Sequence, residues 1–554
     1  MTDSVRSGET SKATPSRRGA TPERDRAARV VVSAAWVVGF AVVGKALGLF
    51  KDIVVASRFG TTAVMDAFLV AFTIPTIIQH WLRSPIRAGF VPLFTEELEK
   101  RGEDAAWHAA GTFVGNFIVV VTVIAVIAIV GAPWLVSAIA PGFGPEAHEL
   151  TVNLARVMLL AIILSAGSGI CTHLLHVHGN FALPSATMPV NNIVLILAAL
   201  FLTRFYGIMG LAYGVVLGSL AHAIVLWPAI WRMRRSIRPR VDFRNPMFLQ
   251  VMRLALPLLI GMAGAKLDDV IDRVFASMLS AGSISGLAYA LRLIDLPKEI
   301  LVSAFSIVLF PLFSRLAARG DHEALGDRLI DSMRLAFFVL LPVSVGMAFL
   351  GEPFVRLIFQ RGAFGEESVR YTYSAVLLYT PTIWALGLTT IMTAGFISMK
   401  DTKTPVIAGF VRLGFKIALV FALIGAFEHA GIALATSVSH VFKLAVFFFV
   451  LPPAIRHGRY GRLFKSFGGT VISTAVMAVA LVGLTRLLGD DLVPGSTAMR
   501  ALVLLMVAAA GGAVYVVAAR LVAKRELSDA LLAFREGLGE ARRRRRAGSE
   551  DGAA

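Results

Sequence analysis

The feature that most constrains this chain is a series of apolar stretches, each about twenty residues long, that recurs from Val30 to Val522. A helix of that length crosses the hydrocarbon core of a bilayer, which is about 30 Å thick. The stretches are continuous rather than alternating, which excludes the strands of about ten residues that build a membrane barrel. Only 16% of the residues are charged. The chain is therefore predicted to be an all-α polytopic membrane protein.

The apolar pattern predicts about fourteen membrane-spanning helices. They are expected at residues 31–56, 62–82, 108–131, 150–173, 184–203, 209–231, 250–276, 284–313, 332–350, 370–396, 405–424, 431–451, 467–487 and 500–522. Lys and Arg gather in the loops after the second, sixth, eighth and twelfth spans, whereas residues 133–150 hold neither. By the positive-inside rule, both termini are predicted to be cytoplasmic.

The two halves of the chain resemble each other at an offset of about 220 residues. The matching segments are 90–94 with 309–313, 132–134 with 352–354, Pro184 with Pro405, and 210–212 with 431–433. Two copies of six spans predict two six-helix lobes, related by an axis along the membrane normal, with a central cavity between them. The last two spans have no counterpart and form an addition at the C-terminal end.

These patterns divide the chain into five expected segments. They are a disordered basic cytoplasmic tail at 1–29, lobes at 30–236 and 237–455, the two additional helices at 456–523, and a second basic cytoplasmic tail at 524–554. The net charge of +18 lies mostly beside the spans and in the tails, which indicates membrane topology rather than nucleic-acid binding. Cys171 is the only cysteine, which excludes an intrachain disulfide and a cysteine metal site.

Three permanent cations, Lys45, Lys51 and Arg292, lie within or at the edge of apolar spans. A charge at the centre of a membrane helix costs about 2.5–3.5 kcal/mol on insertion scales. Such residues are expected to line a wet cavity that faces something negative, so the sequence predicts a carrier for an anionic substrate. For Lys51 the alternative is snorkelling of the amine to the interface. For Lys45 the alternative is neutralisation by Asp66 on the second span.

Other charged pairs have a structural interpretation from their spacing. Arg292 and Asp295 are three residues apart and could form an ion pair on one helix face. Asp269 and Arg273 are spaced for mutual neutralisation. On an ideal helix Asp52 shares a face with the residue seven positions earlier, Lys45.

The second span ends in polar residues, of which His80 and Arg83 are candidates for substrate contact. Their alternatives are an interfacial histidine and a topogenic anchor. Arg412 and Lys416 are four apart on the eleventh span and repel each other, so they need an anion, water or acids from another helix.

No soluble-type catalytic signature is present: the chain has neither a Walker loop nor a His-Glu-x-x-His motif. His173, His176 and His178 cluster after the fourth span without a nearby acid or cysteine, which makes a poor metal site. Without a nucleotide site, transport is expected to depend on the membrane potential or an ion gradient, the ion being unknown. No cofactor or metal is expected.

Several short segments, in this order and spacing, resemble the lipid II flippase family, also called MurJ or MviN. That family lies within the multidrug/oligosaccharidyl-lipid/polysaccharide exporter superfamily. The resemblance covers roughly residues 30–522. The segments that carry it are Lys45, Gly48, Lys51 and Asp52; Asp66 to Phe72 with Pro75; Phe90-Val91-Pro92; Asp272-Arg273 with Ala276-Ser277; Arg292-Leu293; and Asp401-Thr402-Lys403-Thr404-Pro405.

The resemblance implies a transporter rather than an enzyme. It would move undecaprenyl-pyrophosphate-linked peptidoglycan precursor, lipid II, from the inner to the outer leaflet of the bacterial cytoplasmic (inner) membrane by alternating access. It also implies a basic cavity, with the two extra helices forming a groove for the lipid tail. The implied substrate-binding residues are Lys45, Lys51, Arg292, Asp66, His80 and Arg83, and the supporting ion pairs involve Asp52, Asp295, Asp269 and Arg273. The expected partners are the anionic lipid-linked sugar, membrane lipids and cell-wall synthesis proteins, with no nucleic acid, and the protein is expected to be a monomer.

The chain departs from the family pattern at a few positions. Lys45 and Lys51 stand where the family usually has arginine, which keeps the charge but loses the bidentate fork. Gln79-His80 replaces a common basic pair, and Glu299 replaces a small residue. Arg412 and Lys416 disfavour the sodium site of some members. The alternatives are therefore a flippase for another lipid-linked glycan, or a multidrug or cation exporter of the same superfamily.

Overall fold

The computed structural model describes residues 22–177, 179–233, 239–456, 460–489, 496–532 and 535, and the secondary structure of these residues is helical. The helices up to the middle of the chain are α1 Pro22–Phe59, α2 Ala63–Pro85, η1 Ile86–Phe90, α3 Val91–Arg101, α4 Glu103–Val130, α5 Ala132–Ile139, α6 Pro145–Val177, α7 Ala182–Leu197, η2 Ala198–Leu202, α8 Thr203–Tyr206 and α9 Met209–Met233. Those of the second half are α10 Pro246–Ser277, α11 Ser283–Ala318, α12 His322–Phe359, α13 Glu366–Tyr379, α14 Pro381–Ser398, α15 Lys403–Val450, α16 Pro453–Arg456, α17 Tyr460–Leu488 and α18 Thr497–Val522.

Ten helical stretches among the described residues are long and apolar enough to cross a membrane. An eleventh is α11, which is bent by 40° between Ser303 and Val308. The bend lies about one turn before Pro311, where a proline removes a backbone donor and crowds the preceding turn. The prediction of an all-α polytopic membrane protein is confirmed.

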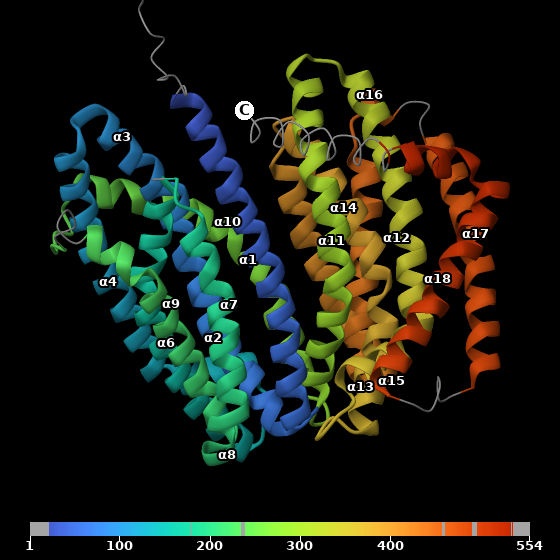
Figure 1. Ribbon diagram of the computed structural model, residues 1–554, viewed down its shortest axis with the longest axis horizontal. Helices are drawn as coiled ribbons and strands as arrows, with labels where there is room; N and C mark the ends of the chain where they lie inside the picture. Colours follow the sequence, from blue (N-terminus) through green and yellow to red (C-terminus); the bar gives the residue numbers. More distant parts are fainter. Residues whose placement is uncertain are drawn as a thin grey trace, which may run out of the picture.

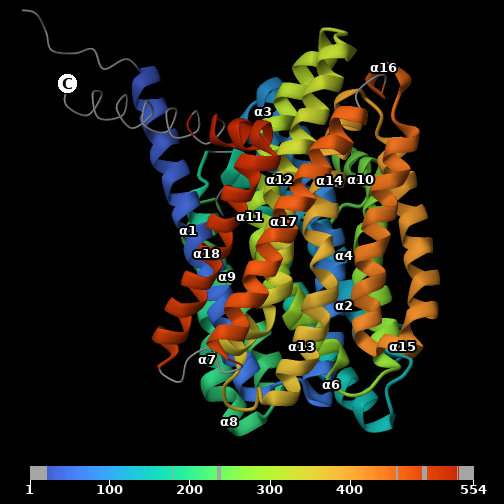
Figure 2. The same ribbon diagram turned by 90° about the vertical axis from the view of Figure 1, so that its right-hand side faces the viewer.

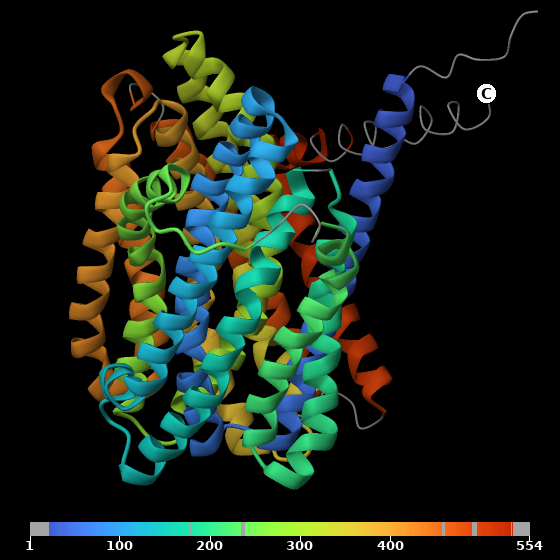
Figure 3. The same ribbon diagram turned by 90° about the vertical axis from the view of Figure 1, so that its left-hand side faces the viewer.

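The helices form two groups (Figure 1). The blue and green helices α1 to α9 lie on one side, and α11 to α18 lie on the other. Helix α10 packs against both α2 and α15 and so links the groups. The first described turns of α1 lean away from the bundle (Figure 3), and Trp36, Val38 and Val42 there are exposed. This surface is the kind that a membrane helix presents to lipid.

Helix starts recur along the chain with nearly constant spacing, which matches the offset of the sequence repeat. Helix α11 starts 220 residues after α2, α12 starts 219 after α4, and α13 and α15 each start 221 after α6 and α7, as the first residues show: Ala63 and Ser283, Glu103 and His322, Pro145 and Glu366, Ala182 and Lys403.

Helix α15 is a hairpin of two packed arms. Its chain breaks at Glu428, where φ is 48° and ψ is −132°, a conformation that costs a non-glycine residue about 1–2 kcal/mol. The rings of Phe415 and Phe442 stack with centroids 4.1 Å apart, and Arg412 donates to Ser439 Oγ at 3.3 Å. The arms lie side by side at one edge of the molecule (Figure 2), so this helix covers two of the predicted spans, 405–424 and 431–451.

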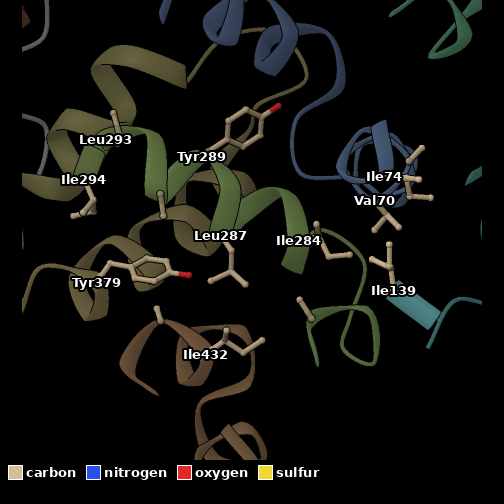
Figure 4. Packing of buried hydrophobic residues seen from close by; sticks show 14 of the residues in the cluster. Val70, Ile74, Ile139, Ile284, Leu287, Tyr289, Leu293, Ile294, Tyr379 and Ile432 are labelled. Atoms are coloured by element: carbon tan, nitrogen blue, oxygen red, sulfur yellow. The ribbon is translucent and has the colours of Figure 1, made fainter. Parts of the chain in front are cut away.

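The core around α11 is apolar and draws side chains from both groups of helices. Leu287 and Leu293 of α11 lie with Val70 and Ile74 of α2 and with Tyr379 of α13 in one cluster (Figure 4). All five are at most 3% exposed, except that Val70, Leu293 and Tyr379 are fully buried. This packing holds α11 at the centre of the molecule, where its polar face reaches the cavity described below.

The two ends of the described chain extend further as helix than the sequence pattern predicts. Helix α1 begins at Pro22, within the segment expected as a disordered tail. Beyond α18, residues 524–532 are helical, and Glu526 and Leu527 there are each 8% exposed. The remaining parts of the two predicted tails, 1–21 and 536–554, lie outside the described residues.

Candidate functional site: a charged cavity beside α11

A cavity of about 300 Å³ lies between α1, α2, α10 and α11, and it contains most of the charged residues that the sequence singled out. One wall is apolar and comes from α2, with Phe68, Leu69 and Phe72. The opposite walls are charged. The charged lining residues are Lys51, Asp52, Lys266, Asp269, Asp272, Arg273, Arg292 and Asp295.

Close packing of α1 on α7 fixes where the cavity residues of α1 stand. A Cβ on Gly44 would lie 3.1 Å from Met188, so the glycine permits a short distance between the two helices. Asn192 of α7 donates to the Gly44 carbonyl oxygen at 2.9 Å. With α1 held in this rotation, Lys51 and Asp52 reach the cavity.

One carboxylate in the cavity serves two cations. Asp52 Oδ1 lies 3.1 Å from Lys51 Nζ, and Asp52 Oδ2 lies 3.2 Å from Arg292 Nε. The cluster therefore carries one surplus positive charge. The Arg292 side chain is 55% exposed, so its guanidinium keeps donors free for a ligand. A guanidinium can grip a phosphate through two parallel hydrogen bonds.

Lys45 lies outside this cavity lining and makes a different pair from the one suggested by sequence. Its Nζ lies 2.6 Å from Glu299 Oε2 of α11, and both side chains are 54% exposed. The suggested neutralisation of Lys45 by Asp66 is therefore wrong. Glu299, noted in the sequence as an unusual acid, is the partner that joins α1 to α11.

Asp66 caps a helix instead of facing the cavity. It is 3% exposed, and its two carboxylate oxygens accept from the backbone N–H groups of Gly282 and Ser285, each at 2.7 Å. These groups belong to the unsatisfied donors at the start of α11, where negative charge is favoured. Asp66 therefore fastens α2 to α11 at this end of the molecule.

The same end carries further contacts between the two groups of helices. Thr61 donates its N–H and its hydroxyl to Ser368 Oγ at 3.2 and 2.8 Å. Ala363 N–H donates to the Ser57 carbonyl oxygen at 2.8 Å. Gly362, at φ 60°, would place a Cβ only 2.2 Å from that oxygen, so only glycine fits. We call these contacts the seam; it closes the molecule where α1 ends and α11 begins.

Two further ion pairs suggested by spacing have other partners in the structure. Asp295 pairs with Lys298 rather than with Arg292, which reaches Asp52 on α1. Asp269 pairs with Lys266 at 2.8 Å. Arg273, expected to neutralise Asp269, donates to the carbonyl oxygen of Ile284 at 3.3 Å. Contacts between helices took precedence over neighbours three or four residues apart on one helix.

His80 and Arg83 lie on the last turns of α2 and are not part of the cavity lining. The residues of α2 that line it furthest along the chain are Thr76 and Ile77, about one turn earlier. Arg83 is exposed and His80 is partly buried. The structure thus groups Lys51, Asp52, Asp269, Arg273, Arg292 and Asp295 in one cavity and leaves Lys45, Asp66, His80 and Arg83 outside it.

A buried network between α10 and α15 supports the cavity from behind. Asp268 accepts from Arg412 Nη2 at 2.9 Å and from Lys416 Nζ at 2.7 Å, and Lys416 also lies 2.7 Å from Asp272. The Lys416 side chain has no exposed surface. The sequence predicted that Arg412 and Lys416 need acids on another helix; the acids are Asp268 and Asp272, which are also four residues apart.

The cavity is less basic than the resemblance implies. Its described lining holds four acids and four bases. Two of the acids are neutralised from behind the wall, Asp272 by Lys416 and Asp295 by Lys298. Counting those two cations with the lining leaves a surplus of two positive charges. The expectation of a cavity lined mainly by bases is therefore wrong, but the charge left for a ligand is positive.

The predicted histidine cluster can be placed only in part. The His173 and His176 ring centroids lie 6.0 Å apart, and His178 lies outside the described residues. Within the described part of the chain, no group of three or more His, Cys, Asp or Glu side chains is arranged to hold a metal ion.

Comparison with known proteins assigns the chain to a family. The family model described as lipid II flippase MurJ matches residues 55–503. A protein of Buchnera aphidicola subsp. Schizaphis graminum, named probable lipid II flippase MurJ, is 25% identical over 403 residues, which cover 72% of this chain and 78% of that protein.

Solved structures show the same fold. A lipid II flippase MurJ in an inward closed conformation matches with a TM-score of 0.71 at 21% identity, over 86% of this chain and 98% of that one. An inward-facing multidrug resistance transporter of the MATE family in the MOP superfamily matches with a TM-score of 0.62 at 14% identity, over 78% and 98% of the two chains. Because the family model covers most of its length, this chain belongs to the lipid II flippase MurJ family.

Proposed function

We propose that this protein moves lipid II, the undecaprenyl-pyrophosphate-linked peptidoglycan precursor, from the inner to the outer leaflet of the bacterial inner membrane. Membership of the lipid II flippase MurJ family supports the assignment. The observation that carries it is the Lys51–Asp52–Arg292 cluster, which faces a cavity inside a membrane protein and keeps a surplus positive charge. In this proposal the protein acts as a transporter and catalyses no covalent chemistry.

The cluster suits a pyrophosphate headgroup. Burial of an anion without compensating charge is prohibitive, so cations must replace the water that the headgroup loses. Arg292 supplies a planar set of donors and Lys51 a compact ammonium. Asp52 holds both cations while the cavity is empty, and an arriving phosphate competes with it for them. The polyprenyl tail stays in lipid or beside α17 and α18, where Val479 and Leu505 are 74% and 69% exposed.

The proposed architecture has fourteen spans in two six-helix lobes and a C-terminal pair. The count adds α1, α10 and α11 to the ten stretches of clear length and apolarity, and takes the two arms of α15 as separate spans. The recurrence of helix starts at intervals of 219 to 221 residues supports the two lobes. Helices α17 and α18 pack together against α12 and form the added pair (Figure 2).

The proposed mechanism is alternating access. The seam closes one end of the molecule through Asp66, Thr61 and Ala363. We place that end at the outer face, with both termini in the cytoplasm, because the loops at the other end are rich in Lys and Arg. The headgroup then enters from the cytoplasm, and rocking of the lobes opens the seam to release it outside. The membrane potential or an ion gradient provides the driving force, and no cofactor or nucleic acid takes part.

Two alternatives stay open. A different lipid-linked glycan would use the same phosphate chemistry, so the cavity does not distinguish it from lipid II. A cation or drug exporter is favoured by the four acids of the lining and by the fold shared with a MATE transporter. Against it, two of those acids are already paired with Lys298 and Lys416. In either case we expect a monomer that works beside cell-wall synthesis proteins or membrane lipids.

The function is tested by depletion of the protein in its own cells, followed by an assay of lipid II exposed on the outer leaflet. The proposal expects lipid II to accumulate on the inner leaflet and exposure to return when the wild-type chain is supplied again. Unchanged exposure after depletion would exclude the proposed function. Accumulation of a different lipid-linked glycan would assign the cargo to that glycan, and accumulation of a cationic dye alone would favour the exporter.

A further inference from the structure

The helical segment that follows α18, residues 524–532, is fixed to the body of the protein at one end of the bundle (Figure 1). Ala523 and Leu527 are 2% and 8% exposed and belong to a cluster with Phe338 of α12 and Tyr515 of α18. A segment packed in this way has a definite position relative to the last turn of α18. It is therefore part of the folded protein and not only a stretch of topogenic charge.

A buried ion pair fixes the rotation of this segment. Glu526 Oε1 accepts from Arg334 Nη2 of α12 at 2.5 Å, and the two side chains are 9% and 5% exposed. Arg334 also donates through Nη1 to Asp331 at 3.0 Å. Because Glu526 must point to α12, the residues on the opposite side of the segment must point outward.

The outward side forms a basic cavity with an apolar rim. A cavity of about 470 Å³ is lined by three cations, a hydroxyl group and three leucines: Arg520, Lys524, Arg535, Ser528, Leu527, Leu531 and Leu532. Leu531 and Leu532 are 50% and 54% exposed, and Leu521 beside them is 76% exposed. Asp529 is the one acid on the outward turns of 524–532, and it is not part of the lining.

We propose that this cavity, the C-terminal basic pocket, binds the phosphate headgroup of an anionic glycerophospholipid from the leaflet at this end of the molecule. The pocket lies just beyond the end of the apolar helix α18, at the depth where headgroups meet water. Arginine and lysine contribute charge, and Ser528 contributes a hydroxyl, to the phosphate. The exposed leucines suit the acyl chains immediately below it. The lipid is a structural partner and not the transported cargo, so this site is independent of the proposed transport.

A membrane lipid fits the pocket better than a soluble anion does. Free phosphate would leave Leu521, Leu531 and Leu532 facing water, whereas a lipid covers them with acyl chains. Each basic residue near an anionic membrane surface contributes attraction that corresponds to about a fivefold gain in affinity. Two of the lining cations together are therefore expected to change lipid affinity about thirtyfold.

The test uses the full-length purified protein in mild neutral detergent and measures binding of short-chain phosphatidylglycerol, of phosphatidylcholine and of inorganic phosphate. The pocket variant is Arg520→Gln with Lys524→Gln. The matched control is Arg525→Gln with Arg319→Gln, which removes the same charge from exposed residues outside the pocket. Thermal unfolding checks that both variants are folded.

We expect phosphatidylglycerol to bind the wild type much more tightly than phosphatidylcholine, and the pocket variant to lose about thirtyfold in that affinity while the control loses little. Equal losses in the two variants would mean that diffuse surface charge attracts the lipid and would overturn the site. So would equal binding of the two lipids. Binding of inorganic phosphate as tight as that of phosphatidylglycerol would overturn the assignment to a lipid.

Discussion

Two ion-pair clusters of similar composition lie on opposite sides of α10, and they differ in their contact with water. Between α10 and α15, Asp268 binds Arg412 and Lys416, whose side chains are 9% and 0% exposed. In the cavity, Asp52 binds Lys51 and Arg292, whose side chains are 19% and 55% exposed. In each cluster one aspartate holds two cations, yet only the second cluster can be reached by a ligand.

The difference shows how burial decides the role of a charge in this membrane protein. A buried pair loses its hydration, so each member depends on its partner and neither can leave. A cavity pair keeps part of its hydration and is weakly coupled, so a phosphate can replace Asp52 beside Arg292 at little cost. We infer that the α10–α15 cluster maintains the fold and that the cavity cluster binds the headgroup.

The largest effect is expected from Lys416→Met in the buried cluster. The substitution leaves Asp272 without its ammonium partner and removes one of the two cations on Asp268. Loss of one partner of a buried pair costs about 3–5 kcal/mol. Thermal unfolding in detergent should show a large fall in the midpoint, or the variant should fail to accumulate as folded protein.

The matched control for that variant is Lys100→Met, which breaks an exposed pair with Glu96 on α3. The control should unfold at the wild-type temperature. If Lys416→Met unfolds there as well, burial does not distinguish the two clusters and the comparison fails.

An intermediate effect is expected from Glu526, whose partner Arg334 is buried outside the membrane-spanning segments' ion-pair clusters. Burial by itself would raise the pKa of Glu526, but hydrogen bonds from Arg334 and Ser466 lower the pKa below its ordinary 4.5. A lowered folded-state pKa stabilises the protein above the unfolded-state value, and that stability is lost as the pH falls through the folded-state pKa. Glu526→Gln should cost about 1.5–3 kcal/mol at neutral pH.

The measurement is the unfolding midpoint of the wild type and of Glu526→Gln as a function of pH. The difference between them should be constant near neutral pH and should shrink at acid pH, below the ordinary range of glutamate. A difference that stays constant into strong acid would show that the carboxylate charge of Glu526 does not hold the C-terminal segment.

The smallest effect on stability is expected from Arg292→Gln in the cavity. The guanidinium is half exposed, and such pairs contribute about 0–1 kcal/mol. The unfolding midpoint of the variant should lie close to that of the wild type. A loss as large as that of Lys416→Met would mean that the cavity cluster is also a structural element, and it would remove the reason to regard Arg292 as available to a ligand.

The sequence predicts the fold class well because the physics of the bilayer is local. A span needs about twenty apolar residues wherever it stands, so the helical stretches and the repeat could be recognised without knowing how helices pack. The limits of α1 could not, because the turns from Pro22 to Arg29 are polar and continue the helix beyond the apolar stretch.

The candidate site was predicted in its residues more than in its contacts. Lys51, Asp52 and Arg292 stood out as charges inside apolar spans, and they meet in one cavity. Their partners depend on which helices face each other, which spacing along one helix does not show. Arg292 therefore seemed to pair with Asp295, whereas it pairs with Asp52 some 240 residues away.

The buried network carried a signal that was only partly used. Arg412 and Lys416 are four residues apart, and so are their acceptors Asp268 and Asp272. Equal spacing of opposite charges on two helices indicates that the helices pack side by side. Asp66 carried no such signal, because the backbone N–H groups that it caps have no trace in the sequence of side chains.

The central claim is that the cavity cations carry the phosphate headgroup across the membrane, and it is tested most directly by lipid II translocation in vesicles that contain the purified protein. The wild type is compared with Lys51→Gln combined with Arg292→Gln, and with a control that loses the same charge at Arg319 and Arg525. We predict that the cavity variant folds, inserts and translocates lipid II at least about tenfold more slowly, which corresponds to a loss of about 1.4 kcal/mol in the barrier, while the control keeps the wild-type rate. Translocation by the folded cavity variant at the wild-type rate would contradict the account.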